Sequence, residues 1–517
     1  MGISTRYTYG GDIADTEAKW IMSKRYIIAL DEGTTSARAL VYDTEMEKIV
    51  SVVNKPFRQI YPHPGWVEHD PEEIWSSQLG SLLEVKAVLE IDFDEVYALG
   101  ITNQRETVVV WNRENGEPVY NAIVWQCRRT AQYCNELIQE GYNDMIKAKT
   151  GLKIDAYFSA TKIKWILDNV EGARELAEAG KLCAGTIDTY LAWKLSGGKC
   201  FVTDYSNAAR TLLFNIHTLE WDDELLDLFD IPKSMLPKVV DSSGVVGTTD
   251  IFDADIPIAG ICGDQQSALF GQACFDEGMA KNTYGTGCFM LLNTGSKVIP
   301  TKELLTTIAW GVDGKVTYAL EGSIFNAGSV VQWMRDELKL IEKASDTEEM
   351  CLSIEDTNGV YLVPAFTGLG APYWDMNARG TIVGLTRGVN RNHIVRAGME
   401  SMAYNTKAIF DKMTEDGGIE VKEMRCDGGV SRDNFLMQFQ ADMLGCTTNK
   451  QQSAECTAMG VVYLAGLATG VFTSLDDISN KINITRRFVP KMPKGKVDEL
   501  YAGWNRAVAI TKYGSTL

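Results

Sequence analysis

The chain has 517 residues, 45% of them hydrophobic, so it is long enough to bury two or more separate cores. It carries 50 Lys and Arg residues against 69 Asp and Glu residues, which gives a formal net charge of −19. This charge repels polyanions and argues against a general binder of nucleic acids or anionic membranes, although small anions can still bind in locally basic clefts.

Eleven cysteines are scattered along the chain without CxxC or zinc-like spacing. This pattern is typical of reduced thiols in an intracellular protein, so we expect a cytoplasmic location and no cysteine-bound metal. The longest apolar runs have the length of strands and do not approach the ~20 residues that span a bilayer. Residues 1–21 are polar and lack the apolar core of a signal peptide. We interpret them as an extension that is disordered or artificially added before a more natural start at Met22.

The first predicted element is a β-hairpin, with strands at Tyr26–Leu30 and Ala39–Tyr42. An ordinary hairpin would explain a Gly-Thr turn by itself. This turn, however, also carries an acid, hydroxyl groups and an arginine at Asp31, Thr34, Thr35, Ser36 and Arg38. Backbone N–H groups and hydroxyls can cradle phosphates, a carboxylate can hold hydrated Mg²⁺, and the arginine supplies positive charge.

A second polar cluster follows the predicted strand Val96–Ile101. Arg105 and Glu106 are adjacent, and their simplest interpretation is a solvated turn. In a cleft, a donor fork beside an acceptor carboxylate would instead suit a ligand rich in hydroxyl groups, which both donate and accept. Trp125 either joins the core or packs on the C–H groups of such a ligand. Tyr157 stands at the start of a predicted helix.

The stretch 260–287 is interpreted as the junction of two similar halves. An apolar strand at Ile256–Cys262 is followed by Asp264 and a helical run, so the simplest role of this acid is a helix cap. The next turn, 284–287, has two glycines around Thr286, which allow close approach of a ligand to the backbone. Because it repeats the first hairpin, it indicates an internal duplication that clasps one polyphosphate.

The second half continues to alternate strands and helices. We interpret Asn326 as a helix cap and Gly328 as the open helix N-terminus, where an anion can bind. A strand at Glu423–Cys426 leads through a Gly-Gly turn into a helix at Asn434–Leu444. The small residues of 457–466 predict a closely packed helix at a domain hinge.

Six motifs, in this order, closely resemble the glycerol kinases of the FGGY carbohydrate-kinase family: ALDEGTTSAR, GITNQRET, YNAIVWQCRRT, GDQQSALFG, NTYGTGCF and PAFTGLGAPYWD. The resemblance runs from about Lys24 to Trp504 and includes YFSATKIKWILDN and GTIVGLTRGVNRNHIVRAGME, which look like the two family signatures. It implies an α/β protein with two actin-like (ribonuclease H-like) domains and a nucleotide-binding cleft between them. We expect the domain that binds glycerol and phosphates at 22–272 and the domain that binds adenine nucleotide at 273–517.

The resemblance also implies the reaction and its residues. ATP and glycerol would give ADP and sn-glycerol 3-phosphate, with Asp264 as the general base. Glycerol would be bound by Arg105, Glu106, Trp125, Tyr157, Asp264, Gln265 and Phe289. ATP or ADP would be bound by Thr34, Thr35, Ser36, Arg38, Thr286, Gly328, Gln332, Gly429 and Asp433, and Mg²⁺ by Asp31 and Asp264. The expected assembly is a dimer or tetramer without nucleic acid or a membrane span.

One position departs from the family pattern. Asp433 stands where glycerol kinases usually place an Asn beside the adenine, and Asn434 follows it. An ionised carboxylate can accept a hydrogen bond from the exocyclic amine of adenine but cannot donate to a ring nitrogen. Either Asp433 or, after a shift of one residue, Asn434 is therefore expected beside the base.

Two other classes of protein fit part of the sequence. A related sugar kinase such as a xylulokinase would share the ATP half but need a larger polyol pocket, and the Arg105-Glu106 pair with Trp125 favours glycerol. An actin- or Hsp70-like nucleotide switch would use the same fold to bind a partner. That alternative is disfavoured because no peptide-binding module follows the second domain and because a cleft acid beside a hydroxyl-binding pair suits a small substrate.

Overall fold

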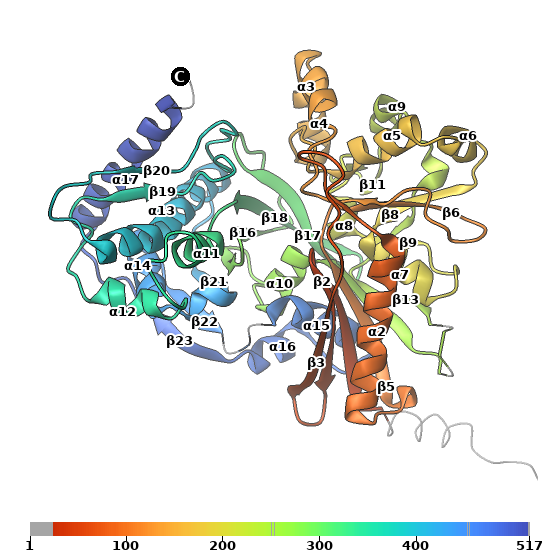
Figure 1. The fold of residues 1–517 in the computed structure, drawn as a ribbon. Coiled ribbons are helices and arrows are strands. Elements are labelled where there is room, and N and C mark those ends of the chain that lie inside the picture. Colours follow the sequence, from red (N-terminus) through yellow and green to blue (C-terminus); the bar gives the residue numbers. More distant parts are fainter. Residues whose placement is uncertain (1–23, 250, 253, 452, 454, 515–517) are drawn as a thin grey trace, which may run out of the picture.

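The computed structural model describes residues 24–249, 251–252, 254–451, 453 and 455–514, so the predicted extension at 1–21 lies outside the described residues. Two lobes stand side by side (Figure 1), and one sheet, thirteen strands wide within the described residues, runs through both. Its order is β23 (Ile484–Phe488), β22 (Thr448–Gln451), β21 (Glu423–Asp427), β15 (Met279–Tyr284), β16 (Cys288–Gly295), β18 (Lys315–Ile324), β17 (Leu305–Val312), β13 (Ser243–Thr248), β14 (Pro257–Gly263), β5 (Val96–Asn103), β1 (Tyr26–Glu32), β2 (Ser36–Asp43) and β3 (Lys48–Pro56).

The two halves of the sheet repeat one arrangement of five strands. In the first half, β1 pairs antiparallel with β2 and parallel with β5, while β2 pairs antiparallel with β3 and β5 parallel with β14. In the second half, β15 pairs antiparallel with β16 and parallel with β21, while β16 pairs antiparallel with β18 and β21 parallel with β22. The two predicted hairpins therefore occupy equivalent places. The predicted duplicated α/β fold is confirmed.

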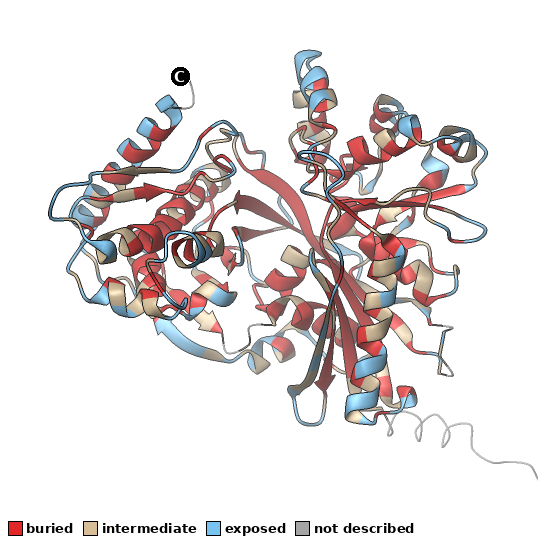
Figure 2. Ribbon diagram, viewed as in Figure 1, coloured by how far each residue is buried: buried red, intermediate tan, exposed pale blue. Residues whose placement is uncertain are grey.

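Strand β1 shows why the centre of the first lobe is so apolar. Ile28 and Leu30 pack in a cluster with side chains of α2 (Pro71–Leu89), whereas Ile27 and Ala29 pack with those of α15 (Cys456–Ala468). Because alternate side chains of a strand point to opposite faces, a strand covered on both faces becomes a continuous hydrophobic run. All four residues are fully buried, and buried strands fill the interior while the outer helix faces are exposed (Figure 2).

The helices α10 (Asp264–Gly271) and α15 follow equivalent strands, β14 and β22, and lie against each other between the lobes (Figure 1). Their backbones approach closely because glycines face carbonyl groups. A Cβ at Gly460 would overlap the carbonyl oxygen of Ser267, and a Cβ at Gly271 would overlap that of Cys456. The Ser267 hydroxyl also donates to the Thr457 carbonyl at 2.6 Å. The predicted close packing of this small-residue helix is confirmed.

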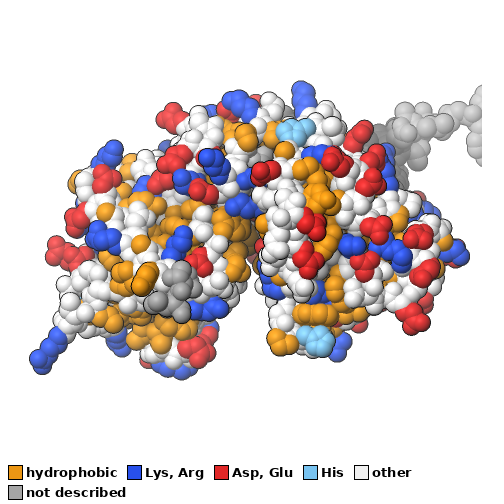
Figure 3. All heavy atoms as spheres, turned by 90° about the horizontal axis from the view of Figure 1, so that it is seen from above, with side chains coloured by type: hydrophobic (Ala, Val, Ile, Leu, Met, Phe, Trp, Pro, Cys, Tyr) orange, Lys and Arg blue, Asp and Glu red, His pale blue; other side chains and the backbone are white. Residues whose placement is uncertain are grey.

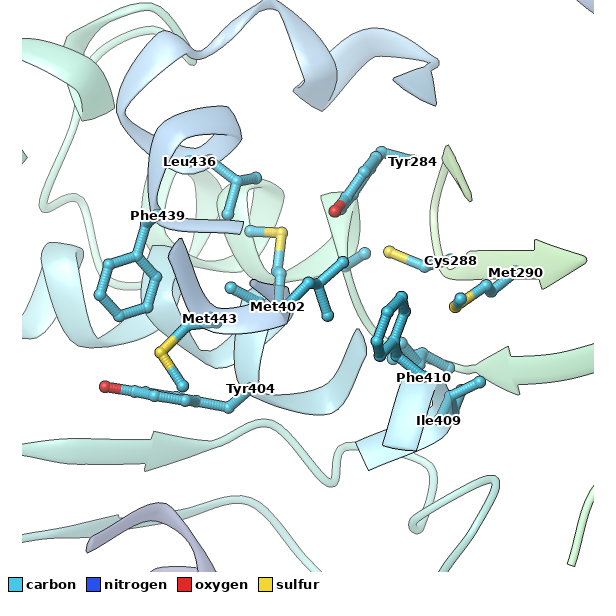
Figure 4. Close-up of a cluster of buried hydrophobic side chains, with 14 of the residues drawn as sticks. Tyr284, Cys288, Met290, Met402, Tyr404, Ile409, Phe410, Leu436, Phe439 and Met443 are labelled. Carbon is cyan, nitrogen blue, oxygen red and sulfur yellow. The ribbon is translucent and has the colours of Figure 1, made fainter. Parts of the chain in front are cut away.

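The core of the second lobe forms around α13 (Arg391–Gly417) and α14 (Asn434–Leu444), the latter with the predicted bounds. Figure 4 shows Ile409 and Phe410 of α13 beside Met290 of β16, with Phe439 and other side chains of α14 on the other side. These side chains pack against the strands of the second hairpin, so a packed core holds the hairpin in place.

The remaining elements surround these two cores. A smaller sheet of the first lobe has the order β4 (Glu68–His69), β7 (Ala122–Ile123), β6 (Val108–Asn112) and β8 (Leu182–Thr186). The other elements before β13 are η1 (Phe93–Glu95), α3 (Ala131–Gln139), α4 (Asn143–Thr150), α5 (Ser159–Asn169), α6 (Ala173–Glu178), α7 (Ile187–Leu195), β9 (Val202–Asp204), α8 (Tyr205–Ala208), β10 (Phe214–Asn215), β11 (Glu220–Trp221), α9 (Asp223–Phe229), η2 (Lys233–Met235) and β12 (Lys238–Val240). Those after β18 are α11 (Gly328–Asp336), α12 (Asp346–Leu352), β19 (Tyr361–Val363), β20 (Thr381–Val383), η3 (Gly429–Arg432), α16 (Leu475–Lys481) and α17 (Lys494–Gly514). Within the described residues, no helix combines the length and apolar character needed to cross a membrane.

The α10–α15 contact generates a stability prediction. Gly460→Ala should lower the free energy of unfolding by about 1–3 kcal/mol, because the added methyl group overlaps a backbone carbonyl that cannot move away alone. Urea denaturation followed by circular dichroism measures the change. Gly80→Ala in α2 is the matched control, because its Cβ meets only the flexible end of Lys55; it should be neutral or stabilising by up to about 1 kcal/mol. Equal stability of both variants would contradict the prediction.

Candidate active site

Side chains from both halves of the chain meet where β14 passes into α10, and the molecule is indented between its lobes (Figure 3). Gly263 is the N-cap of α10 and Asp264 is its first residue, so the simple interpretation of Asp264 as a side-chain cap does not hold. The Asp264 Oδ1 atom accepts from the backbone N–H of Gln265 at 2.7 Å and lies 3.2 Å from Arg105 Nε. Partial burial raises the pKa of Asp264, while Arg105 and Lys281 lower it.

Arg105 and Glu106 belong to a network of four buried charges. The Arg105 guanidinium meets the Glu321 carboxylate twice, Nη1 to Oε2 at 2.6 Å and Nη2 to Oε1 at 3.1 Å. Arg210 connects the two carboxylates. Its Nε atom donates to Glu106 Oε1 at 2.6 Å, and its Nη2 atom donates to Glu321 Oε1 at 3.0 Å. Each of the four side chains is at most 2% exposed, so the simple interpretation of a solvated turn is wrong.

The network fixes the charge of its members. Burial alone would raise the pKa of Glu321, but Arg105 and Arg210 lower it to about 2. Glu106 has a backbone φ of 62°, in the left-handed region that a non-glycine residue seldom adopts. Such a conformation persists where surrounding contacts hold it, and here the hydrogen bond from Arg210 holds the side chain. Glu106 is therefore a pre-positioned acceptor.

Two aromatic side chains extend this set toward the first hairpin. Tyr157 accepts at 3.4 Å from Arg105 Nη2 through its hydroxyl, and its ring lies edge-on to Trp125 with 5.6 Å between the centroids. The Trp125 indole N–H donates to Thr34 Oγ1 at 3.0 Å. These contacts bring the hydroxyl-binding candidates next to the Gly/Thr turn. Phe289 is on β16 opposite Thr283, and within the described residues no ring contact joins it to Trp125.

The first turn holds its acid and arginine together. Asp31 Oδ2 lies 2.8 Å from Arg38 Nη2, and Arg38 Nη1 donates to Glu455 Oε2 of the second half at 3.1 Å. Burial raises the pKa of Asp31, and Arg38 lowers it. Thr35 is exposed and Ser36 is half-buried, so neither is enclosed by the core.

The second turn is docked onto the start of α11. The Gly328 N–H donates to the Gly285 carbonyl at 3.0 Å, and the N–H groups of Ala327 and Ser329 donate to the Thr286 carbonyl at 2.8 and 3.1 Å. A Cβ at Gly328 would lie 2.5 Å from the Gly285 oxygen and 3.5 Å from Val430, so only glycine fits. Thr286 and Gly328 are thus adjacent.

Two further predicted nucleotide residues lie around this turn. A Cβ at Gly429 would meet open space, whereas one at Gly428, with φ of 88°, would overlap the Tyr284 carbonyl. The Gly-Gly pair thus places an unobstructed backbone beside the second hairpin. Gln332 is exposed on α11.

Asn326 and Asp433, two polar residues on this side, both have partners within the protein. Asn326 does not cap α11: the N-cap is Ala327, and Asn326 Oδ1 instead accepts from the Ser329 hydroxyl at 3.2 Å. Asp433 caps α14 by accepting from Leu436 N–H at 2.9 Å, and its other oxygen accepts from Thr347 Oγ1 at 2.7 Å. Both oxygens of Asp433 therefore already have protein donors, and its contact with adenine stays a prediction.

The alternative adenine residue is also engaged by the protein. Asn434 donates from its side-chain amide to both oxygens of Glu348, at 3.0 and 3.1 Å. Neither candidate is free in this conformation. A contact with the base would therefore have to share or replace these hydrogen bonds.

Sequence reasoning missed three charged residues of the site: Arg210, Lys281 and Glu321. Lys281 is fully buried, and its Nζ donates to Gln265 Oε1 at 2.6 Å and to Thr283 Oγ1 at 2.9 Å. Burial lowers the pKa of Lys281 to about 8, against the attraction of Asp427 and Asp264. The available signal was Glu321, an ionisable residue in the apolar part of strand β18, because a buried acid is rare without a partner. Across the described residues, no group of three or more His, Cys, Asp or Glu side chains is arranged as a metal site.

Comparisons with known proteins identify the family of this chain. Residues 26–271 match the N-terminal domain and residues 280–469 the C-terminal domain of the FGGY family of carbohydrate kinases. The chain belongs to this family. It is 60% identical over 487 residues to a glycerol kinase of Caldanaerobacter subterraneus subsp. tengcongensis, covering 94% of this chain and 98% of that one. It is also 60% identical over 491 residues to a glycerol kinase of Carboxydothermus hydrogenoformans, with the same coverage.

Solved structures show the same fold. The crystal structure of Plasmodium falciparum glycerol kinase with ADP is 39% identical, with a TM-score of 0.89 over 94% of this chain and 98% of that chain. A ligand-bound xylulose kinase from Lactobacillus acidophilus has a TM-score of 0.83 at 24% identity, over 95% of this chain and 100% of that chain. At that identity, the second likeness concerns the fold alone.

The buried network predicts how stability depends on pH. The pKa of Glu321 is depressed in the folded state, so its contribution is present above its ordinary pKa of 4.5 and is lost as the pH falls toward 2. Glu321→Gln should therefore cost about 3 kcal/mol of unfolding free energy at pH 7, and much less near pH 3.

Urea denaturation at both pH values measures this difference. The control is Glu499→Gln, whose partner Lys496 is exposed on α17; it should change stability by less than about 1 kcal/mol at either pH. A cost for Glu321→Gln that does not shrink as the pH falls would contradict the assigned pKa.

Proposed function

We propose that this chain transfers the terminal phosphoryl group of ATP to glycerol and produces ADP and sn-glycerol 3-phosphate. The main observation behind this proposal is that hydrogen-bond donors and acceptors converge around Asp264, an arrangement that suits a small molecule with several hydroxyl groups. The relatives named glycerol kinase, 60% identical over nearly the full chain, support the same substrate.

The proposed roles around glycerol follow from the contacts. Arg105 and Gln265 would donate to hydroxyl oxygens, Glu106 would accept from hydroxyls, and Tyr157 can do either. Trp125 and Phe289 would pack on the carbon face of glycerol. Each polar member already has its geometry set by the protein, so little ordering is left for substrate binding.

Asp264 is the proposed general base. Its hydrogen bond and its ion pair both use Oδ1, which leaves Oδ2 to accept the proton of the attacking hydroxyl. The hydroxyl oxygen then attacks the terminal phosphorus in line, ADP leaves, and the proton stays on the carboxyl group. Phosphoryl transfer depends mainly on such alignment and on neutralised charge.

The two Gly/Thr turns are the proposed nucleotide cradle. Thr34, Thr35, Ser36 and Arg38 would bind the terminal phosphates from the first lobe. Thr286, Gly328, Gln332, Gly429 and Asp433 would bind ADP from the second lobe. Gly328 and Gly429 support this assignment because they keep the backbone free of side chains beside the turn.

We assign Mg²⁺ binding to Asp31 and Asp264, together with the phosphates. Asp31 fits this role, because its buried Oδ2 has the Arg38 ion pair but no hydrogen-bond donor among the described residues. Mg²⁺ commonly uses one or two carboxylates plus phosphate oxygens and water, and it would neutralise phosphate charge. Such a site needs fewer protein carboxylates than a closed metal cage.

Three broader assignments complete the proposal. Residues 22–272 form the glycerol and phosphate domain and residues 273–517 the nucleotide domain, with the α10–α15 contact as the hinge. The active form is a dimer or tetramer. The protein acts in the cytoplasm, as its eleven free, buried cysteines suggest.

A coupled assay of ATP consumption tests this function. Rapid consumption with glycerol, slow consumption with xylulose and little without an acceptor is the expected result. A preference for xylulose would identify a different sugar kinase of the family. Consumption that ignores both acceptors would instead indicate a nucleotide switch.

Asp264→Asn tests the general base. The amide keeps the shape of the side chain but cannot accept the proton, so kcat should fall roughly 10²–10⁴-fold while thermal stability stays near that of the unsubstituted protein. Asp223→Asn, which removes the same charge from an exposed position on α9, is the control and should retain normal turnover. Near-normal kcat in Asp264→Asn would assign Asp264 a structural role only.

A further inference from the structure

Lys281 is a fully buried amine on β15 that reaches across to α10 of the other half of the chain. Side chains of a strand alternate, so Lys281 and Thr283 share one face of β15. The register places Thr283 beside Asp427 on the neighbouring strand. The Lys281 ammonium group thus faces oxygen acceptors, and it donates hydrogen bonds to Gln265 Oε1 and Thr283 Oγ1.

The chemistry of an ammonium group decides the orientation of the Gln265 amide. A lysine ammonium has three donors and no acceptor, so the end of Gln265 that faces it must be the oxygen. The amide N–H groups are then directed away from Lys281. Asp264 directly precedes Gln265 and accepts from the Gln265 backbone N–H at 2.7 Å.

The opposite orientation of the amide would harm the reaction. Gln265 Nε2 would then face the Lys281 ammonium, which leaves two donor groups without an acceptor, and Oε1 would be directed away from Lys281. The same oxygen would also compete with Asp264 for the proton of the attacking hydroxyl. An isolated glutamine side chain has no strong preference between its two amide orientations, so a third group must select one.

We propose that Lys281 is a positioning residue for the glycerol site: it holds the oxygen of the Gln265 amide, so that Gln265 acts only as a donor toward the substrate. This inference rests on the proposed function, because it assigns Gln265 to glycerol. It also makes the substrate site depend on a residue from the nucleotide half. Lys281 itself need not touch glycerol.

A purely structural role for Lys281 has different consequences. The neighbouring carboxylates Asp427, Asp264 and Glu321 all attract its charge, so its removal should alter stability in either case. A structural role, however, would not raise the KM for glycerol selectively. Nor would it make the effect of removing Lys281 depend on the presence of Gln265.

The test is a double-mutant cycle with Lys281→Met, Gln265→Ala and the double variant, assayed for both substrates. Lys281→Met keeps the length and apolar stem of the side chain. We expect it to raise the KM for glycerol roughly 10-fold, the effect of one lost hydrogen bond, and to change the KM for ATP less than about twofold. In the Gln265→Ala background, Lys281→Met should have no further effect on the KM for glycerol.

Controls keep the outcome decisive. Thr283→Val removes the other acceptor of Lys281 but leaves the contact with Gln265, so it should keep the KM for glycerol near normal. Lys281→Arg, which still only donates, should restore part of the glycerol affinity. If Lys281→Met does not fold, Lys281→Gln replaces it in the cycle, because glutamine can donate or accept and enforces neither orientation.

Two results would overturn the inference: additive effects of Lys281→Met and Gln265→Ala, or a KM for ATP that rises as much as the KM for glycerol. Both presuppose that the unsubstituted protein consumes ATP in a glycerol-dependent way. Failure of that prior measurement would overturn the proposed function instead. The two failures are therefore distinguishable.

Discussion

The buried ion pairs among Arg105, Glu106, Arg210 and Glu321 are the constraint on which the candidate site depends. Three of these residues come from the first lobe, and Glu321 comes from β18 of the second half. Buried charges are costly to desolvate, so such a network is weak evidence for extra stability. Its value here is geometric, because each guanidinium accepts only a narrow set of carboxylate positions. It fixes Arg105 and Glu106 relative to both lobes.

The duplicated fold contains two similar turns but gives them different chemistry. Aligning the hairpins on their three-residue turns sets Gly33-Thr34 against Gly285-Thr286, and Asp31 then corresponds to Thr283. The acid of the second lobe is Asp427, one strand away. The first turn therefore offers a carboxylate and an arginine, and the second offers glycines and backbone. This asymmetry suits a ligand whose two ends differ in charge.

Besides the shared sheet, the two lobes are joined by contacts that lie close to this chemistry. Gly460 and Gly271 allow the helices α10 and α15 to touch through their backbones, and α10 carries Asp264 at its first position. Arg38 reaches Glu455 at the start of α15. A rotation of one lobe against the other would thus move the proposed base and the phosphate-binding arginine together.

The sequence by itself determined the features that depend on local chemistry. The hairpins, the strand before Asp264 and the helix Asn434–Leu444 follow from hydrophobic periodicity and from glycine and threonine in turns. The motifs, by resemblance, also identified the kinase family. These features could be predicted because neighbours along the chain supply most of their determinants.

Only the tertiary structure decided which residues complete the site. Arg210 meets Glu106 across 104 residues of the chain and Glu321 meets Arg105 across 216, while Lys281 reaches Gln265 from the next strand along the chain. Likewise, Asn326 had the composition of a cap, but the docking of the 285–287 turn gave that position to Ala327. The physical reason is that the partner of a buried charge or backbone group is set by packing between distant segments, which local sequence does not encode.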